Sequence, residues 1–140
     1  MTGHLDEQAQ RLIATALELA GRRGMAVSIA VVDGVGALVA FRRMDGAPRF
    51  SADFAVAKAR TAATFAVPTA TLEDLYRDRP AFAQSFIAQG GYFLGRGGAP
   101  VVVDGEVAFG IGISGADAGG EDEVARIVAG VIPDDRGGSD

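Results

Sequence analysis

The sequence predicts an α+β domain in which an antiparallel β-sheet is flanked by helices. Apolar residues recur at helical spacing near both ends of the chain, and strand-like runs occur in two pairs. Short glycine-containing turns join the members of each pair. Strands joined by such turns favour an antiparallel sheet with helices packed on it. Strict β-α-β alternation is missing, which argues against a Rossmann fold.

Composition indicates the size and class of the protein. The chain has 140 residues, of which 49% are hydrophobic and 22% charged, as is typical of a soluble globular protein. We expect one domain over residues 1–133 and a disordered polar tail over residues 134–140. The net charge is −5 and the Lys and Arg residues are spread along the chain, so no nucleic-acid partner is expected.

Residue types that are rare or missing exclude several classes of site. The chain has no cysteine and one histidine, His4, so disulfides, catalytic thiolates and sites built on several histidines are excluded, and no metal site is expected. The longest apolar run, "MAVSIAVV", is too short to span a bilayer, so no membrane partner is expected. The first ten residues, "MTGHLDEQAQ", are acidic and unlike a signal peptide, which predicts a cytoplasmic location.

The N-terminal half predicts a helix, a hairpin and a second helix. Apolar residues recur at helical spacing from Leu5 to Ala20, and Gly24 is a natural stop. "AVSIAVVD" and "ALVAFRR" are strand-like runs separated by "GVG", which indicates a hairpin. The loop "RMDGAPRF" leads into a helix from about Ser51 to Ala66, with Ser51 as its N-cap.

The C-terminal half predicts short helices, a second hairpin and a closing helix. Pro68 ends the preceding helix, and residues 69–91 form two helical pieces broken at Pro80. "GYFLGRGGAP" is expected to be a strand leading into a loop. "PVVV" and "EVAFGIGIS" flank Asp104-Gly105, a favoured dipeptide of a type I′ hairpin turn. A last helix carries apolar residues at helical spacing, namely Val124, Ile127, Val128 and Val131.

The helix that begins at Ser51 has one unusual stripe beside its alanine-rich face. At 100° per residue, one narrow stripe collects Phe54, Lys58, Thr61 and Phe65. If the stripe is structural, Lys58 lays its stem over the rings and reaches water, while Thr61 bonds to a carbonyl one turn earlier. If it lines a pocket, it offers an ammonium and a hydroxyl between aromatic faces. Such a wall suits a flat ligand that bears carboxylates.

The loop before this helix brings an acid close in sequence to the lysine. Asp45 near Lys58 would form a paired acid and base, so both are candidate catalytic residues. The loop also feeds a helix N-terminus, where backbone amides and the helix dipole favour anions. A plain turn at Asp45-Gly46 is the structural alternative.

Two further patterns have both a structural and a functional interpretation. In "FGIGIS", Gly110, Gly112 and Ser114 share one strand face, which suggests close approach of either a helix or a ligand. In "GADAGGEDE", the acids could ligate a hard cation, but their spacing does not match an EF-hand loop. Acids in the first turn of a helix are also expected because of the helix dipole.

Several stretches together resemble the GlcG/HbpS family of haem-binding and haem-degrading proteins, which includes the C-terminal domain of PduO-type proteins. They are "IAVVDGVGALVAFRRMDGA", "AVAKARTAATF", "GGAPVVVDGEVAFGIGISG" and "EDEVARIVAG". The match covers about residues 5–131. Its most specific pieces are "RMDGA", "KARTA" and Ser114-Gly115, in that order.

The resemblance implies a profilin-like fold, assembly into homo-oligomers, and a ligand site near the "RMDG" and "KART" segments. Haem is the ligand of some members. Beside the aromatic stripe, the predicted ligand-binding residues are therefore Arg43, Met44, Asp45, Ser114 and Gly115. The sequence departs from the family where Val35 interrupts the paired glycines of the first turn, and its lone histidine gives little support to histidine ligation of haem.

Two functions follow from these patterns. The first is a cytoplasmic homo-oligomeric protein that binds a small ligand, either haem or another flat carboxylated molecule. The alternative is an enzyme that performs acid–base chemistry on a small unsaturated or cyclic carboxylic acid. In that case the acid–base pair transfers the proton, Arg43 or Arg60 holds the carboxylate, and Thr61 or Ser114 bonds the substrate oxygen.

Overall fold

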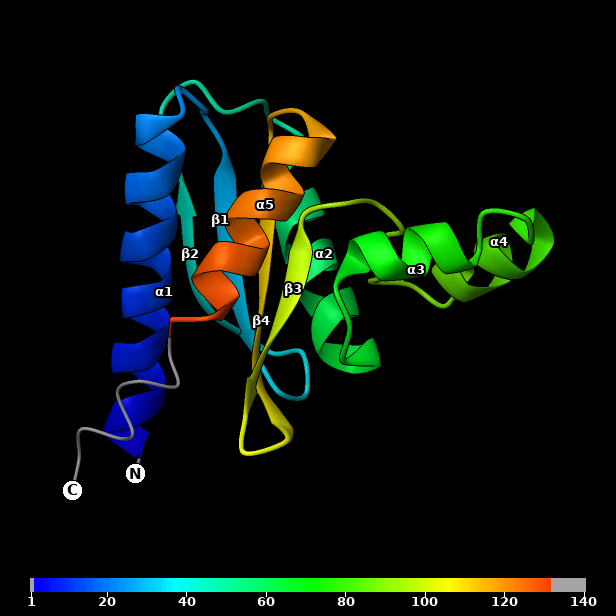
Figure 1. Ribbon diagram of the computed structural model, residues 1–140, viewed down its shortest axis with the longest axis horizontal. Helices are drawn as coiled ribbons and strands as arrows, with labels where there is room; N and C mark the ends of the chain where they lie inside the picture. Colours follow the sequence, from blue (N-terminus) through cyan, green and yellow to red (C-terminus); the bar gives the residue numbers. More distant parts are fainter. Residues whose placement is uncertain (1, 132–140) are drawn as a thin grey trace.

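The computed structural model describes residues 2–131, and the predicted tail lies outside them. It shows a four-stranded antiparallel sheet with helices on both faces (Figure 1), which confirms the α+β class. The elements are α1 (Thr2–Arg22), β1 (Ser28–Asp33), β2 (Leu38–Arg43), α2 (Ser51–Phe65), α3 (Thr69–Leu75), α4 (Pro80–Ala88), β3 (Gly98–Val103), β4 (Glu106–Ser114) and α5 (Ala118–Ala129). None of the helices within residues 2–131 has the length and apolar character needed to cross a membrane.

The two predicted hairpins form the sheet, in the strand order β2-β1-β4-β3. Ser28 at the start of β1 lies opposite both Arg43 of β2 and Ser114 of β4, so all three lie at one end of the sheet. At the other end, Asp104 and Gly105 have φ values of 55° and 80°. A type I′ turn requires positive φ at both central residues, so the turn predicted from this dipeptide is confirmed.

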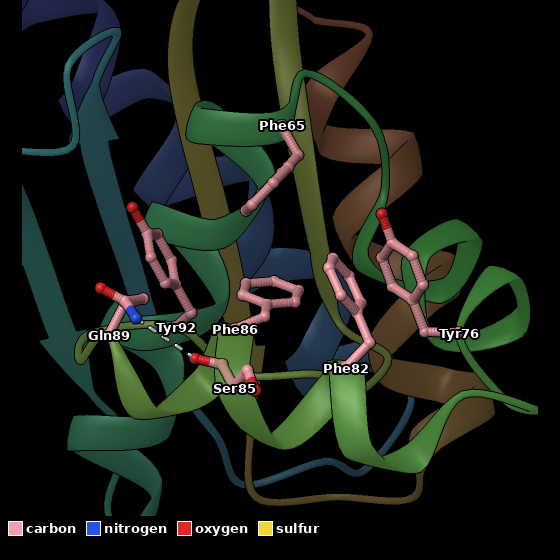
Figure 2. A pocket seen from close by; sticks show the side chains of 7 residues that line it. All are labelled: Phe65, Tyr76, Phe82, Ser85, Phe86, Gln89 and Tyr92. Atoms are coloured by element: carbon pink, nitrogen blue, oxygen red, sulfur yellow. Dashed lines mark hydrogen bonds between the residues drawn. The ribbon is translucent and has the colours of Figure 1, made fainter.

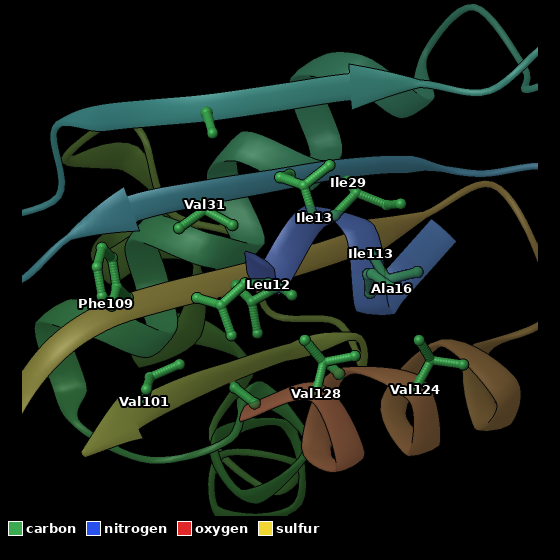
Figure 3. Packing of buried hydrophobic residues seen from close by; sticks show 14 of the residues in the cluster. Leu12, Ile13, Ala16, Ile29, Val31, Val101, Phe109, Ile113, Val124 and Val128 are labelled. Atoms are coloured by element: carbon green, nitrogen blue, oxygen red, sulfur yellow. The ribbon is translucent and has the colours of Figure 1, made fainter. Parts of the chain in front are cut away.

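The sheet carries a core on each face. Helices α1 and α5 cover one face and α2 covers the other (Figure 1). Figure 3 shows the larger core, in which the apolar stripes of α1 and α5 meet side chains from all four strands. Burial of each such aliphatic or aromatic side chain contributes about 1.5–3 kcal/mol. This core includes Leu12, Ile13, Ile29, Phe109, Ile113, Val124 and Val128.

Helix α2 packs on the other face through small residues. A Cβ atom at Gly112 would overlap the carbonyl oxygen of Ala55, and one at Gly110 would overlap that of Ala59. The glycines of β4 thus allow the α2 backbone to approach the strand closely. Of the two interpretations of this pattern, close packing of a helix is the one the structure shows.

The predicted N-cap of α2 is wrong. The cap position is Phe50, which makes no side-chain capping bond, and Ser51 is the first helical residue. The Ser51 side chain is buried between the loop and β1, where its hydroxyl bonds to the Pro48 carbonyl oxygen and to the Ser28 hydroxyl. A buried hydroxyl needs such partners, and they take Ser51 away from the helix amides.

The strand predicted in "GYFLGRGGAP" is also displaced. Strand β3 begins only at Gly98, and the residues from 91 to 97 form no strand. Gly91 and Gly97 have φ values of 80° and 119°, outside the β region. The Phe93 amide donates to the Thr61 hydroxyl on α2 rather than to a neighbouring strand. This segment therefore lies along α2, where it helps to form the site described below.

Helices α3 and α4 form an arm that extends away from the sheet (Figure 1). Pro80 is the first residue of α4, so the break predicted at this proline is confirmed. Polar contacts of α3 join the arm to the body. The Thr69 hydroxyl accepts from the Gly98 amide at 2.9 Å, and Arg96 donates to Asp74 at 2.9 Å.

Candidate functional site

The predicted stripe on α2 is divided by the structure into exposed and buried parts. Phe54 and Phe65 are partly exposed and border two different pockets. Lys58 and Thr61 lie between them and are buried. The Thr61 and Lys58 side chains both contact Phe93, which belongs to the segment that lies along α2. The two polar side chains of the stripe therefore support the wall of a pocket from within.

The first pocket, which we call the arm pocket, lies between the C-terminal end of α2 and the arm (Figure 2). It has a volume of about 310 Å³ and a mostly apolar lining, to which Ser85, Gln89 and the hydroxyls of two tyrosines add polar groups. The Phe65 ring lies 4.8 Å from Phe86 and 5.7 Å from Tyr92, between centroids, as favourable aromatic pairs do. The aromatic lining consists of Phe65, Tyr76, Phe82, Phe86 and Tyr92.

The second pocket, which we call the α2 pocket, runs along the outer face of α2 and has a volume of about 400 Å³. Its aromatic wall is formed by Phe54, Tyr92 and Phe93, with 4.6 Å between the Phe54 and Phe93 centroids. Unlike the arm pocket, it has charged lining residues, Asp53 and Arg60. Because Tyr92 lines both pockets, they adjoin one another at this residue.

Lys58 makes a buried ion pair with Glu121 in the first turn of α5. Its ammonium donates to Glu121 Oε1 and to the Ile113 carbonyl oxygen, each at 3.0 Å, and lies 5.5 Å from the Phe93 ring centroid. The two residues are 4% and 5% exposed. Gly97 makes room for the contact, because a Cβ atom there would lie 3.1 Å from Lys58 Nζ.

The other carboxylate oxygen of Glu121 is also satisfied. Oε2 accepts from the amides of Gly115 and Ala116, each at 2.8 Å. The pair therefore connects α2 on one side of the sheet to α5 and the loop after β4. A buried ion pair of this kind is tolerated when further hydrogen bonds satisfy both charges, as they do for Lys58 and Glu121.

The predicted pairing of Lys58 with Asp45 is wrong. Asp45 is exposed and lines a hollow of about 310 Å³ with Arg43, Met44 and Gly46. Glu121 takes the ammonium instead, from a position 63 residues away in the chain. One sequence signal was available, because Glu121 precedes the buried Val124 by three residues and so lies on the buried face of α5. The sequence prediction interpreted the acids of this segment as partners of the helix dipole and so missed that Glu121 pairs with Lys58.

Thr61 has both a local and a long-range partner. Its hydroxyl donates to the Ala57 carbonyl oxygen at 2.7 Å, which confirms the bond expected from the structural interpretation of the stripe. The same oxygen accepts the Phe93 amide at 2.9 Å. Because Phe93 lines the α2 pocket, Thr61 fixes the backbone that carries one wall of it. The expectation that Lys58 reaches water is wrong, since Lys58 is buried.

The remaining predicted residues lie at the end of the sheet. Ser114 is the buried last residue of β4, and Gly115 follows it with φ at 127°. Arg43, the last residue of β2, donates to the Ala47 carbonyl oxygen of the following loop at 3.1 Å. The structure thus distributes the predicted ligand-binding residues over the hollow beside Asp45, the buried network and the two pockets, instead of bringing them together in one cavity.

The sequence prediction missed the residues that supply most of the aromatic lining. Tyr76, Phe82, Phe86, Tyr92 and Phe93 come from the arm and from the segment that follows it. A signal was present in the concentration of aromatic residues between positions 76 and 93. The sequence does not show how the arm folds back on α2, so the concentration of aromatic residues did not predict a pocket.

The acids of α5 each have a protein partner. Asp117 accepts from the Gly120 amide as the N-cap, Asp122 pairs with Arg126, and Glu123 pairs with Arg23. Within the part of the chain that the structure describes, no group of three or more Asp, Glu or His side chains is arranged to hold a metal ion. Their role here is to cap and pair helices.

Comparison with known proteins decides the family. Residues 6–131 match the family described as "Haem degrading protein HbpS-like". The chain belongs to the HbpS-like family. This confirms the resemblance found in the sequence. This family member is 36% identical over 109 residues to Protein GlcG of Escherichia coli K12, and the aligned part covers 77% of this chain and 78% of that protein.

Solved structures of relatives share its fold. A double mutant of HbpS from Streptomyces reticuli is 35% identical, with a TM-score of 0.82, and the match covers 91% of this chain and 85% of that one. A second relative, PduOC, was solved as a complex with haem. It is 26% identical, with a TM-score of 0.81 and coverage of 90% and 92% of the two chains. The family of this protein thus has a member that binds haem.

Proposed function

We propose that this protein binds a flat, mostly apolar ligand in the arm pocket and the α2 pocket, in the cytoplasm as the sequence predicts. Haem is the leading candidate. The observation that carries the proposal is the aromatic lining of two pockets that adjoin at Tyr92. Aromatic faces stack on conjugated rings, and ligand sites are typically apolar with few polar groups. The haem complex of PduOC supports the choice of ligand.

The described residues are compatible with haem. The apolar walls would cover the faces of the macrocycle, leaving the iron in need of an axial ligand. Tyr76 and Tyr92 line the arm pocket, and a tyrosine phenolate is one of the side-chain ligands that haem iron takes in proteins. Bound haem would supply an iron centre, and one of these tyrosines would hold it.

The residues of the α2 stripe have two different roles in this proposal. Phe54 and Phe65 contact the ligand, because each borders a pocket. Lys58 and Thr61 hold Phe93 in place from beneath and do not touch the ligand. In this proposal Lys58 supports the pocket wall and is not a proton-transfer group, since its ammonium is buried and paired with Glu121.

A haemin titration tests the proposed function. We expect a saturable shift of the Soret band at stoichiometric haemin, whereas no shift would reject haem as the ligand. Tyr76→Phe and Tyr92→Phe each keep the ring and remove the phenol oxygen. The variant that loses the iron ligand should change the Soret position of the complex, while the other keeps it. An unchanged Soret band in both variants would reject tyrosine ligation.

We further propose that the protein is a homo-oligomer. Leu75, Phe82 and Ile87 on the arm are 63%, 40% and 38% exposed, and the sequence of α4 contains no charged residue. Exposed apolar surface of this kind is typical of protein–protein contacts, and identical subunits usually close into symmetric assemblies. Light scattering should give at least a dimer at micromolar concentration. A mass of only 14.3 kDa, that of the monomer, would contradict this.

A further inference from the structure

We propose that Arg60 is the group that recognises a ligand carboxylate, at the part of the α2 pocket next to Gly91. This rests on the proposed ligand-binding function of the two aromatic pockets and adds the chemical class that they select. The ligand class is a flat conjugated acid with its carboxylate at one edge.

Arg60 is a lining residue of the α2 pocket with unused hydrogen-bonding capacity. Its Nε–H donates to the Gly36 carbonyl oxygen at 3.2 Å, in the turn between β1 and β2. A guanidinium has five N–H donors, so this bond leaves the outer nitrogens available. None of the ion pairs between described residues includes Arg60. Its charge is therefore not neutralised by the residues that the structure describes.

Two glycine turns hold the Arg60 side chain in position. A Cβ atom at Gly36 would lie 3.2 Å from Arg60 Cγ, and one at Gly91 would lie 3.1 Å from Nη1. The φ values of Gly36 and Gly91 are 91° and 80°, a conformation that glycine adopts without strain. Because Gly91 lines the α2 pocket, the guanidinium meets the pocket at this point. A side chain ordered in advance loses less conformational entropy when it binds a ligand.

The charges of the pocket define the orientation of the ligand. The other charged lining residue is Asp53, seven residues before Arg60 on α2. At 1.5 Å per residue the two positions are separated by roughly 10 Å along the helix axis. A carboxylate is repelled near Asp53 and attracted by Arg60, whose planar group can bind both of its oxygens. The apolar body of the ligand then lies against Phe54, Tyr92 and Phe93.

The test compares haemin, which has two carboxylates, with haemin dimethyl ester, which has the same ring system and none. Both are titrated into the full-length protein and followed by Soret absorbance. We expect the unsubstituted protein to bind haemin at least about tenfold more tightly than the ester, the effect of one charge-assisted hydrogen bond. Arg60→Gln should bind both probes with the affinity that the ester has for the unsubstituted protein.

Arg126→Gln is the matched control. It removes the same charge from α5, where Arg126 pairs with Asp122, and should keep the full preference for haemin. Equal binding of haemin and ester by the unsubstituted protein, or an undiminished preference in Arg60→Gln, would overturn the assignment while leaving the aromatic site intact. If neither probe binds the unsubstituted protein, the proposed function fails and the role of Arg60 fails with it. If Arg60→Gln does not fold, Arg60→Lys takes its place, because it keeps the charge but loses the planar guanidinium. An undiminished preference of Arg60→Lys for haemin over the ester would overturn bidentate recognition.

Discussion

Replacing Lys58 by Met tests the buried ion pair between α2 and α5. The substitution keeps an apolar side chain of similar length and removes the ammonium, which bonds to Glu121 and to the Ile113 carbonyl oxygen at 3.0 Å each. Glu121, at 5% exposure, would then be a buried charge with only two backbone amides as partners. Removing one partner of a buried pair costs about 3–5 kcal/mol. That is a large part of the 5–15 kcal/mol by which a typical domain is stable.

The assay is urea unfolding followed by circular dichroism. Arg77→Met is the control, because it breaks the exposed pair with Asp74 and should change the free energy of unfolding by less than about 1 kcal/mol. Combining Lys58→Met with Glu121→Gln removes the buried charge and keeps a carbonyl oxygen for the two amides. The double variant should therefore lose less stability than the sum of the single variants. A Lys58→Met protein within about 0.5 kcal/mol of the unsubstituted protein, the range of ordinary surface changes, would refute this reasoning.

Two further substitutions test the packing of α2. Thr61→Val removes the acceptor of the Phe93 amide and should lower the free energy of unfolding by about 1–3 kcal/mol. Thr61→Ser keeps the hydroxyl and should lose little stability. Equal losses of stability in the two variants would contradict the bond. Gly112→Ala places a Cβ atom against the Ala55 carbonyl oxygen and should give a misfolded or strongly destabilised protein. In Gly21→Ala, the added Cβ has no atom within 4 Å apart from the nearby backbone of its own helix, so this control should instead raise the melting temperature. Normal folding of Gly112→Ala would disprove the close approach.

The fold class was predictable because its signals are local. The Asp104-Gly105 turn, the break at Pro80 and the amphipathic first helix each depend on a few neighbouring residues, and all three are present in the structure. The glycines of β4 indicated a close approach correctly, although they did not reveal what approaches. Ser51 shows the limit of local reasoning, because a partner 23 residues away, Ser28, decides where its hydroxyl points.

The site was less predictable because it is assembled from distant segments. The α2 stripe was found, but its lysine is paired with a glutamate 63 residues away and its threonine with an amide 32 residues away. Helical spacing places side chains on one face of a helix, but it does not show what covers that face. Here the segment after the arm covers Lys58 and Thr61. Phe93 of that segment lines the α2 pocket, and the two predicted lining residues lie behind it.

A blocked pocket tests the central claim, that the ligand lies against the outer face of α2, most directly. Ala57 lines the α2 pocket, and Ala57→Trp would fill it with an indole ring. Ala14→Trp adds the same ring at an exposed position of α1, on the opposite side of the sheet. Both folded variants are titrated with haemin. Ala57→Trp should bind it at least about tenfold more weakly than the unsubstituted protein, because the indole fills the site that the ligand needs. Ala14→Trp should bind haemin with unchanged affinity. Haemin binding of undiminished affinity by folded Ala57→Trp would contradict the account and place the ligand elsewhere.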